Sequence, residues 1–417
     1  MNTLAYVILL SNLIILPFDN KADNPEVLAV IKLETGLYER FRNPVALDLE
    51  SFDAYDLSKL ALYEIRDGNR YEVPTQITQT DSPQLHWQLA KRTPVGETLT
   101  YELINEISRR HVEKKMAIEK DVGTYAFMQG TRPVLHYNAA TVYPPEGQDE
   151  AFKRSGFIHP LFAPNGTVLT NIQPADHLHH YGIWNPWTKT TFRDREVDFW
   201  NLRKREGTVR HAGVEEVIEG NIFASLESLH EHIAWPESTL QVLAMKERNI
   251  TQVFHFDEDM YLVDFAFHIT PQEAITLEEY RYGGFVFRGT ETWNNTTSDF
   301  ITSEGLDRDK ADGQRARWCV VTGDTSEGRA GILFMGHVHN FNHPEPLRIW
   351  PSDANRGNGD VFINFSPTRN TSWSLEEGTT YLLRYRLLVF DGEMDTQMAE
   401  KYWNDYANPP LITIEKK

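Results

Sequence analysis

The stretch MYLVDFAFHIT (260–270) decides the fold class, because its apolar residues alternate with polar ones or run together without a helical period. A second stretch, YLLRYRLLVF (381–390), has the same character. A period of two is typical of a strand with one buried face. Comparable runs, bounded by turn residues, lie at 124–130, 133–139, 239–245, 252–257 and 331–338. The pattern predicts an all-β chain with a large antiparallel β-sandwich.

Shorter alternating runs occupy the N-terminal part of the chain, at 27–33, 44–50, 60–66, 71–78 and 98–104. Short strands at this spacing predict a small β-sandwich domain over residues 24–108. Residues 109–120 are charged and are interpreted as a linker, so the larger β domain is expected over 121–417. One short helix is predicted near 394–407, with Thr396 as its N-terminal cap.

Composition limits the classes of function. A length of 417 residues with 41% hydrophobic residues indicates a globular chain of two or three domains. The 60 acidic residues outnumber the 41 basic ones and give a net charge of −19. Such a surface repels a phosphate backbone and an anionic membrane, so neither is expected as a partner. The single Cys319 excludes disulfides within the chain and a Cys-based zinc site.

An apolar run near the N-terminus, AYVILLSNLIILPF (5–18), is too short to span a membrane. It fits the apolar region of a secretory signal peptide over residues 1–20. The other interpretation is a buried N-terminal strand. The signal-peptide interpretation predicts a periplasmic or secreted protein, and no later segment is long and apolar enough to be a transmembrane helix.

The window DHLHHYGIWNPWTKTTFRDREVDFWN (176–201) is the most unusual in the chain, because it holds three His and three Trp residues. On a strand, His177 and His179 would face the same side and His180 the other. Such a pair can exchange protons or hold a metal ion. Trp184, Trp187 and Trp200 could form a platform on which sugar rings stack. The competing interpretation places these aromatic residues in the core.

Three other segments could converge on this window. The segment EEYRYGGFVFRG (278–289) offers carboxylates and two arginines for an anionic group. The segment GHVHNFNHP (336–344) repeats the His-x-His spacing, and FKRSGFIHP (152–160) is basic. The candidate catalytic residues are His177, His179, His180, Tyr181, Arg281 and His337. The candidate substrate-binding residues are His159, Trp184, Trp187, Asp198, Trp200, Glu279, Arg288 and Asn340.

Several of these segments form an ordered pattern: RPVLHYN…GFIHPLFAPNGTVLTNIQPADHLHHYGIW…VDFW (132–200), YRYGGFVFR (280–288) and YLLRYRLLVFDG (381–392). Over about residues 121–395 the chain resembles the PmoA-like family, which carries the label methane oxygenase. The resemblance implies a soluble, often exported bacterial protein found among polysaccharide-degrading systems. It also implies a fold similar to the large supersandwich of galactose mutarotases and several polysaccharide lyases.

These observations lead to the hypothesis of an exported carbohydrate-active enzyme, a lyase or dehydratase that acts on a sugar of the uronic-acid type. A His or Tyr181 would remove the proton next to the carboxylate, which Arg281 or Arg288 would neutralise. A second His would protonate the leaving oxygen. No cofactor is required by this reaction.

Four alternatives stay open. A glycoside hydrolase could use Asp176, Asp198 or Glu279 as paired carboxylates. A mutarotase-like isomerase would use one His and one Glu. A metal-dependent oxygenase would hold its metal with His177, His179 and a carboxylate. A non-catalytic glycan-binding protein would keep the Trp platform and would not need clustered His residues.

Overall fold

The computed structural model describes residues 26–79, 82–106, 114–255 and 257–417, so the expected signal segment at 1–20 lies outside the described residues. Strands dominate this part of the chain, and the largest sheets pair their strands antiparallel. The predicted all-β class is confirmed. No helix in these ranges is long and apolar enough to cross a membrane.

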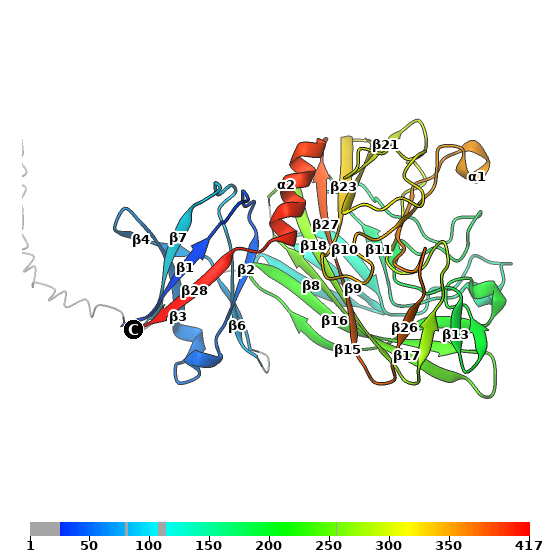
Figure 1. Ribbon diagram of the computed structural model, residues 1–417, viewed down its shortest axis with the longest axis horizontal. Helices are drawn as coiled ribbons and strands as arrows, with labels where there is room; N and C mark the ends of the chain where they lie inside the picture. Colours follow the sequence, from blue (N-terminus) through cyan, green and yellow to red (C-terminus); the bar gives the residue numbers. More distant parts are fainter. Residues whose placement is uncertain (1–25, 80–81, 107–113, 256) are drawn as a thin grey trace, which may run out of the picture.

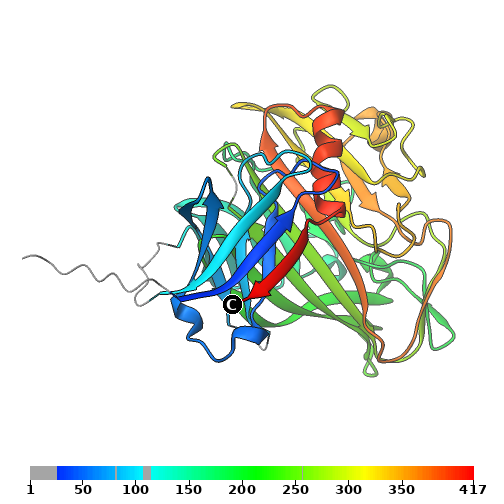
Figure 2. The same ribbon diagram turned by 60° about the vertical axis from the view of Figure 1, so that its left-hand side comes forward.

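The N-terminal domain consists of two small sheets that enclose their own core (Figures 1 and 2). Trp87 and Tyr101 lie at the centre of this core and pack edge to face at 5.6 Å. The five-stranded sheet has the order β28 (Leu411–Lys416), β1 (Glu26–Glu34), β7 (Thr98–Asn105), β3 (Leu60–Arg66) and β4 (Asn69–Val73). The three-stranded sheet has the order β2 (Pro44–Asp48), β6 (Gln84–Gln88) and β5 (Gln76–Thr78).

The C-terminal strand β28 returns to this domain and pairs with β1, as the red arrow beside the blue one in Figure 2 shows. The sequence predicted that residues up to 417 would belong to the larger domain. The last residues instead complete the N-terminal sheet, so the first and last described strands of the chain are neighbours.

The larger domain contains two eight-stranded sheets packed face to face. The long-stranded sheet has the order β15 (Gly207–Ile218), β16 (Phe223–Ala234), β17 (Val242–Phe254), β18 (Met260–Pro271), β27 (Tyr381–Asp391), β23 (Gly328–Gly336), β22 (Trp318–Thr325) and β21 (Ser298–Thr302). The second sheet has the order β24 (Leu347–Ile349), β25 (Phe362–Phe365), β20 (Val286–Arg288), β12 (Ile183–Trp184), β11 (Phe157–Leu161), β10 (Arg132–Asn138), β9 (Thr124–Gln129) and β8 (Met116–Asp121).

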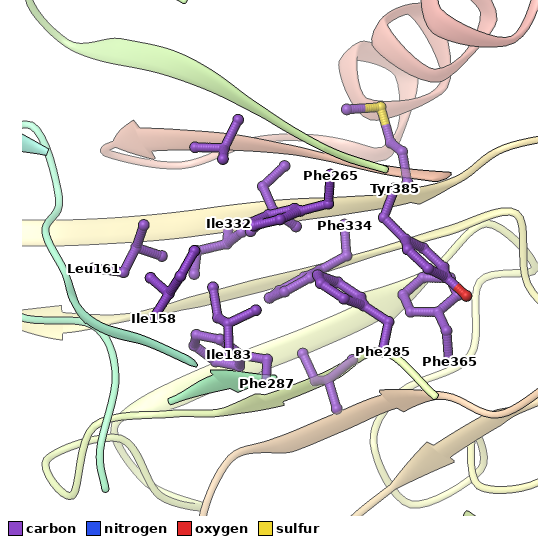
Figure 3. Packing of buried hydrophobic residues seen from close by; sticks show 14 of the residues in the cluster. Ile158, Leu161, Ile183, Phe265, Phe285, Phe287, Ile332, Phe334, Phe365 and Tyr385 are labelled. Atoms are coloured by element: carbon purple, nitrogen blue, oxygen red, sulfur yellow. The ribbon is translucent and has the colours of Figure 1, made fainter. Parts of the chain in front are cut away.

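Apolar side chains from both sheets fill the space between them (Figure 3). Ile158 and Ile183 come from the second sheet, and Phe265, Phe334 and Tyr385 come from the long-stranded one. Each of these side chains is at most 3% exposed. Burying a side chain of this size contributes roughly 1.5–3 kcal/mol, so this layer holds the two sheets together and supports the loops at their edges.

Smaller elements complete the domain. A four-stranded sheet has the order β14 (Arg195–Val197), β13 (Thr190–Phe192), β19 (Ile275–Leu277) and β26 (Trp373–Leu375). The helical pieces are α1 (Ala354–Gly357), α2 (Thr396–Ala407) and the 3-10 turns at Glu50–Phe52, Leu57–Lys59, Glu150–Phe152 and Leu202–Lys204. Helix α2 confirms the predicted C-terminal helix, but Asp395 caps it in place of Thr396, since its carboxylate accepts from the Met398 N–H at 2.7 Å.

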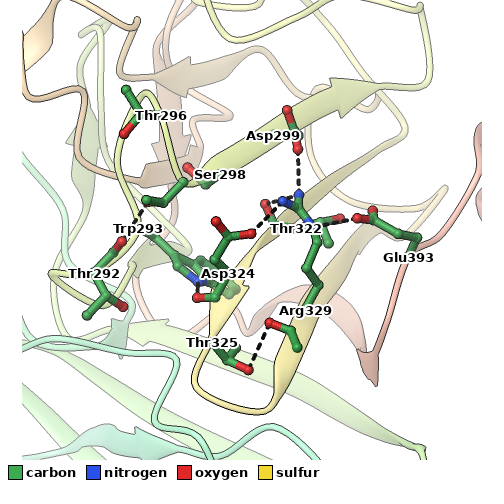
Figure 4. A network of polar contacts seen from close by, with 12 residues as sticks. Thr292, Trp293, Thr296, Ser298, Asp299, Thr322, Asp324, Thr325, Arg329 and Glu393 are labelled. Carbon is green, nitrogen blue, oxygen red and sulfur yellow. Dashed lines mark hydrogen bonds and ion pairs between the residues drawn. The ribbon is translucent and has the colours of Figure 1, made fainter.

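A polar network fixes the far edge of the long-stranded sheet (Figure 4). Arg329 on β23 pairs with Asp299, with Asp324 at 2.8 Å and with Glu393. The indole N–H of Trp293 donates to the Asp324 carbonyl at 3.1 Å. The guanidinium of Arg329 therefore joins three carboxylates from different segments, so this edge has a structural role.

Candidate functional site

The His-rich motif folds as a closed loop in the connection between β11 and β12, two central strands of the second sheet. The Gln173 N–H donates to the His180 carbonyl at 2.8 Å, which joins the two ends of the loop. Two successive turns lie inside it, from Pro174 to His177 and from His177 to His180. The three imidazoles are therefore not on a strand. His177 stacks on His180 at a centroid distance of 4.7 Å, and His179 meets His180 edge to face at 4.8 Å.

Two cavities open on this loop. The loop cavity, about 480 Å³, lies between the motif and the 3-10 turns, and it is lined among others by Asp149, Asp176, Arg203 and Lys204. The aromatic cavity, about 320 Å³, is lined among others by Trp200, Arg281, Tyr282, Arg348, Trp350 and Phe362. His177, His179 and Asn201 line both, so the imidazoles stand at the boundary of one divided cleft.

His177 forms an acid–base pair with Asp176. Its Nδ1 lies 2.6 Å from the Asp176 carboxylate, so Nδ1 carries the hydrogen and Nε2 is left as an acceptor. Arg288 also reaches Asp176 at 3.4 Å and Asp360 at 2.7 Å. Burial acts to raise the pKa of Asp176, but the His177 hydrogen bond and the Arg288 charge outweigh it and lower that pKa. Asp176 is therefore an ionised partner that orients His177.

The other two imidazoles of the motif are neutral at neutral pH. Burial lowers the pKa of His179 to about 4, and it also lowers the pKa of His180 well below its usual value. His180 is 2% exposed, and its Nδ1 has no hydrogen-bond partner among the described residues. His179 lines both cavities and can exchange hydrogen bonds with a ligand, whereas His180 lines only the aromatic cavity and stacks on the ring of His177.

Two further predicted residues, Arg281 and Trp200, lie at the cleft. Arg281 is exposed at the rim of the aromatic cavity. Trp200 forms part of its wall and packs against Tyr282 at 4.8 Å. Both are positioned by loops that the buried aromatic cluster beneath the cleft supports.

The predicted flat platform of three tryptophans is wrong, because Trp187 belongs to the main core and Trp184 and Trp200 to a separate cluster. Trp184 is 2% exposed and Trp187 is fully buried, where it packs against Trp373 in the main core. The flat surface of the cleft comes instead from Trp350, which packs against His177 at 4.7 Å and against Phe362 at 5.0 Å. An aromatic-rich segment shows that large side chains are present but not which of them the fold leaves accessible.

Several predicted residues lie beneath the cleft rather than in it. The Tyr181 hydroxyl donates to the Phe152 carbonyl and accepts from Gln173 at 2.8 Å, and burial raises its pKa to about 12. Tyr181 is thus a poor candidate for the base. Arg288 is 2% exposed and lines neither cavity, and it meets the cleft through Asp176 and through the Trp350 ring at 4.8 Å, so it cannot clamp a substrate carboxylate.

Asp198 and His159 have structural roles. Asp198 accepts from the backbone N–H groups of Trp200 and Asn201 at 2.9 and 2.8 Å and pairs with Lys204 at 2.9 Å, so its oxygens are occupied. His159 pairs with the Thr170 hydroxyl at 2.9 Å, and burial lowers its pKa to about 4.

The remaining predictions place residues away from the cleft. Glu279 is exposed and lines neither cavity. His337 and Asn340 belong to a different region, where Asn340 donates to the Arg384 carbonyl at 2.8 Å and accepts from the Arg384 N–H at 2.8 Å. Asn340 therefore fastens its loop to β27. The two His-x-His pairs do not share a cavity.

No group of three or more His, Cys, Asp or Glu side chains within the described ranges is arranged to hold a metal ion. His177 and His179 line the same cavities, but the Nδ1 of His177 is engaged by Asp176. The donor set that the oxygenase interpretation requires is thus incomplete among these residues.

Sequence reasoning missed Tyr282, Arg348, Trp350 and Asn355 in the aromatic cavity. Asn355 has a left-handed backbone with φ of 50°, which Asn tolerates better than most residues. The segment RIWPSDANRGNGD (348–360) carries a signal that could have pointed to it, since an arginine and a tryptophan precede a loop rich in turn residues.

A second histidine cluster, also missed, is sealed inside the larger domain. Glu247 lies 3.2 Å from His230 and 3.3 Å from His232, and it accepts from the Asn185 amide at 2.9 Å. The Tyr137 hydroxyl pairs with His230 at 2.8 Å and with His211 at 2.7 Å. Glu247 is 1% exposed and His232 fully buried. We call these six residues the sealed cluster.

A family model described as "Family of unknown function (DUF6807)" matches residues 124–404, which is most of the larger domain. No curated protein matches the chain.

Among solved structures, a GalM/aldose epimerase homologue from C. elegans is similar with 8% identity and a TM-score of 0.30, over 68% of this chain and 100% of that one. A galactose mutarotase related enzyme from Lactobacillus acidophilus has 7% identity and a TM-score of 0.27, over 67% and 100%. Heparan sulfate lyase HepC from Pedobacter heparinus has 10% identity and a TM-score of 0.26, over 66% and 36%. Similarity at such low TM-scores supports no conclusion about the activity of this chain.

Proposed function

Because the chain belongs to the DUF6807 family, whose function is unknown, we propose a function from the divided cleft: it removes a proton next to the carboxylate of a uronic-acid-type sugar and eliminates the substituent on the neighbouring carbon. The observation that carries this proposal is the Asp176–His177 pair at 2.6 Å, at the boundary of two cavities. A carboxylate-oriented imidazole with a free Nε2 is a general base that works near neutral pH.

The cations of the cleft support an acidic substrate. Arg281 makes no ion pair within the described residues, so its guanidinium is available to bind a carboxylate through two hydrogen bonds. Arg348 lines the same cavity but pairs with Asp312 at 2.9 Å. Arg281 is thus the residue that neutralises the substrate carboxylate. Neutralisation acidifies the adjacent C–H, because the developing negative charge spreads onto the carboxylate oxygens.

The aromatic walls support a sugar ring. Trp350, Phe362 and Trp200 line the aromatic cavity, and Trp350 keeps the largest exposed fraction of the three, at 8%. A pyranose has an apolar face that packs on such surfaces, while its hydroxyls bind polar groups such as Asn201 and Asn355 on the same cavity. The loop cavity on the other side of His177 has room for the part of the substrate that leaves.

Tyr282 is the residue that protonates the leaving oxygen in this proposal. Its hydroxyl oxygen accepts from the Asn201 amide at 3.3 Å, and burial raises the pKa of Tyr282, so the hydroxyl carries its proton at neutral pH. The sequence-based assignment gave this role to a second His, but the pKa of His179 at about 4 leaves that ring without a spare proton at neutral pH. Tyr282 lines the same cavity as His177.

The elimination balances as follows. The proton next to the carboxylate moves to Nε2 of His177, and the C–H electron pair forms the new C=C bond. The bond from the neighbouring carbon to its oxygen substituent breaks, and that oxygen takes the Tyr282 proton. Water returns the proton from His177 to the phenolate of Tyr282. Arg281 and Asp176 keep their charges throughout.

Incubation of the purified protein with uronic-acid oligosaccharides tests the proposal, because the conjugated C=C bond absorbs in the ultraviolet. We expect absorbance to rise with acidic oligosaccharides and not with neutral ones, and Arg281→Ala to raise KM about tenfold or more. Release of reducing ends without absorbance would indicate hydrolysis instead. Saturable binding without any turnover across the panel would indicate a glycan-binding protein, and either result would overturn the elimination.

A further inference from the structure

A third cavity lies where the two domains meet, on the opposite face of the long-stranded sheet from the core. It has a volume of about 320 Å³ and shares no lining residue with the divided cleft. Asn43 from the N-terminal domain, Tyr406 from α2 and His337 line it together with residues of β17, β18 and β27. We call it the junction cavity. His337, from the second His-x-His segment at 336–344, lines this cavity, and no residue of that segment lines the divided cleft.

Strand register builds the floor of the junction cavity from two rows of side chains. One row crosses the sheet as Gln252, Asp264 and Arg386, and the adjacent row as Ile250, Ala266 and Arg384. Residues two apart on a strand face the same side, so both rows point away from the core. The methyl group of Ala266 leaves space beside Arg384 that a larger residue would fill.

The two arginines of the floor differ in their partners. Arg386 donates two hydrogen bonds to the Asp264 carboxylate, at 2.6 and 2.7 Å, so its charge is neutralised. The Arg384 guanidinium makes no hydrogen bond or ion pair with any residue in the described ranges. One half-buried positive charge therefore remains without a counter-charge in a chain whose net charge is −19.

His337 adds a hydrogen-bond donor. Its Nδ1 accepts the His339 backbone N–H at 3.2 Å, so the ring hydrogen lies on Nε2. The residue is 9% exposed and lines the cavity. Burial, followed by the charge of Arg384, lowers the pKa of His337 to about 3. A positive surrounding that suppresses protonation of an imidazole is one that attracts an anion.

We infer that the junction cavity is a second binding site, for a small hydroxylated ligand that carries an oxyanion group, which docks on Arg384 and the Nε2–H of His337. Gln252, Asn43 and Tyr406 are placed to bind hydroxyl groups of the same ligand. Because these residues come from both domains, an occupied site would also stabilise their contact. A volume of about 320 Å³ is within the usual range for small-molecule sites.

Calorimetric titration of the full chain with glucuronate, glucose and inorganic sulfate tests this inference. We expect glucuronate to bind, glucose to bind at least tenfold more weakly, and Arg384→Ala to weaken glucuronate binding at least tenfold. Arg384 has no side-chain partner to lose, so the variant should fold as the parent does. The titrations use an Arg281→Ala background, which removes the carboxylate-binding arginine of the aromatic cavity. Arg193→Ala is the matched control, because this exposed arginine pairs with Glu273, lines neither the cleft nor the junction cavity, and should leave the binding event unchanged.

The sulfate arm separates the two sources of an oxyanion. Sulfate binding that is lost in Arg384→Ala, without glucuronate binding, assigns the site to an inorganic anion; glucuronate binding assigns it to an acidic sugar. Bound ligand should also raise the pKa of His337, measured from its imidazole resonances by NMR. Absence of binding by both anions, equal binding of glucose, or an unchanged affinity in Arg384→Ala would each overturn the inference.

Discussion

The protein contains two histidine–carboxylate clusters of similar composition and opposite accessibility. At the cleft, Asp176 holds His177 at 2.6 Å and two cavities meet at the ring. In the sealed cluster, Glu247 holds His230 and His232 at 3.2 and 3.3 Å, and packing leaves Glu247 1% exposed. Composition alone does not separate them. Access to a cavity, rather than the presence of an acid–base pair, therefore distinguishes a reactive cluster from a structural one.

The carboxylates of both clusters are kept ionised by their partners, but Glu247 is the more deeply buried of the two. Burial acts to raise the pKa of Glu247, but the hydrogen bonds from His230 and His232 outweigh it and lower that pKa to about 2. The charged carboxylate is thus stabilised only by its folded neighbours. We therefore expect changes to the sealed cluster to alter stability, and changes at the cleft to alter turnover.

The largest stability effect should come from Glu247→Ala. This change leaves the side chains of His230, His232 and Asn185 buried without their shared acceptor, which costs about 3–5 kcal/mol of unfolding free energy. Denaturant unfolding measures it, with Glu279→Ala as an exposed control that should stay within about 0.5 kcal/mol. A loss below 1 kcal/mol for Glu247→Ala would show that this cluster does not stabilise the fold.

Acid should remove the contribution of Glu247. Its folded pKa of about 2 lies below the unfolded value near 4.5, so the stabilisation is complete above pH 4.5 and is lost as the pH falls toward 2. The advantage of the parent over Glu247→Gln should shrink by about 3 kcal/mol across this window. Unfolding curves at stepped pH values measure the difference. A constant difference between pH 5 and pH 2.5 would contradict the assignment.

A smaller effect is expected at Asp176, which positions the base. Asp176→Asn keeps the shape but removes the charge and the preference for a hydrogen on Nδ1 of His177, so kcat should fall at least about tenfold. KM should stay within about twofold, because Arg281 still binds the carboxylate, and the pH profile of kcat should move. Equal kcat values and pH profiles in the two proteins would remove Asp176 from the mechanism.

The smallest effect is predicted for Tyr181→Phe. The variant loses the hydrogen bonds to Phe152 and Gln173 and should lose about 1 kcal/mol of stability. Its kcat should stay within about twofold of the parent, since the ring lies beneath the cleft. Thermal unfolding and steady-state kinetics measure the two quantities. Abolished turnover in a stable variant would restore Tyr181 as a catalytic residue.

The two clusters also explain where the sequence predicted the fold and where it did not. The stretches at 260–270 and 381–390 coincide with β18 and β27, because their inward residues are apolar. Strand β17 was predicted as two separate runs, at 239–245 and 252–257. Its inward residues include Glu247, Asn249 and Thr251, all at most 7% exposed, so the sealed cluster hides the alternation of this strand.

The candidate site was predicted only in part, because a local sequence pattern shows neither burial nor contacts between distant segments. His177 and His179 are close in sequence, so their density alone pointed to the loop. Tyr282 and Trp350 come from segments far along the chain, and only the sheet order brings them beside His177. Burial separated Tyr181 and Trp184 from the accessible His177, which no local pattern could indicate.

The most direct test of the central claim compares His177→Ala with His211→Ala on an acidic oligosaccharide that gives the unsaturated product. His211 is the half-buried end of the sealed cluster, so both variants remove an imidazole from a histidine network. We expect His177→Ala to lower kcat/KM by roughly 10²–10⁴-fold with a nearly unchanged melting temperature, while His211→Ala retains the parental rate. Parental turnover in a folded His177→Ala variant would contradict this expectation.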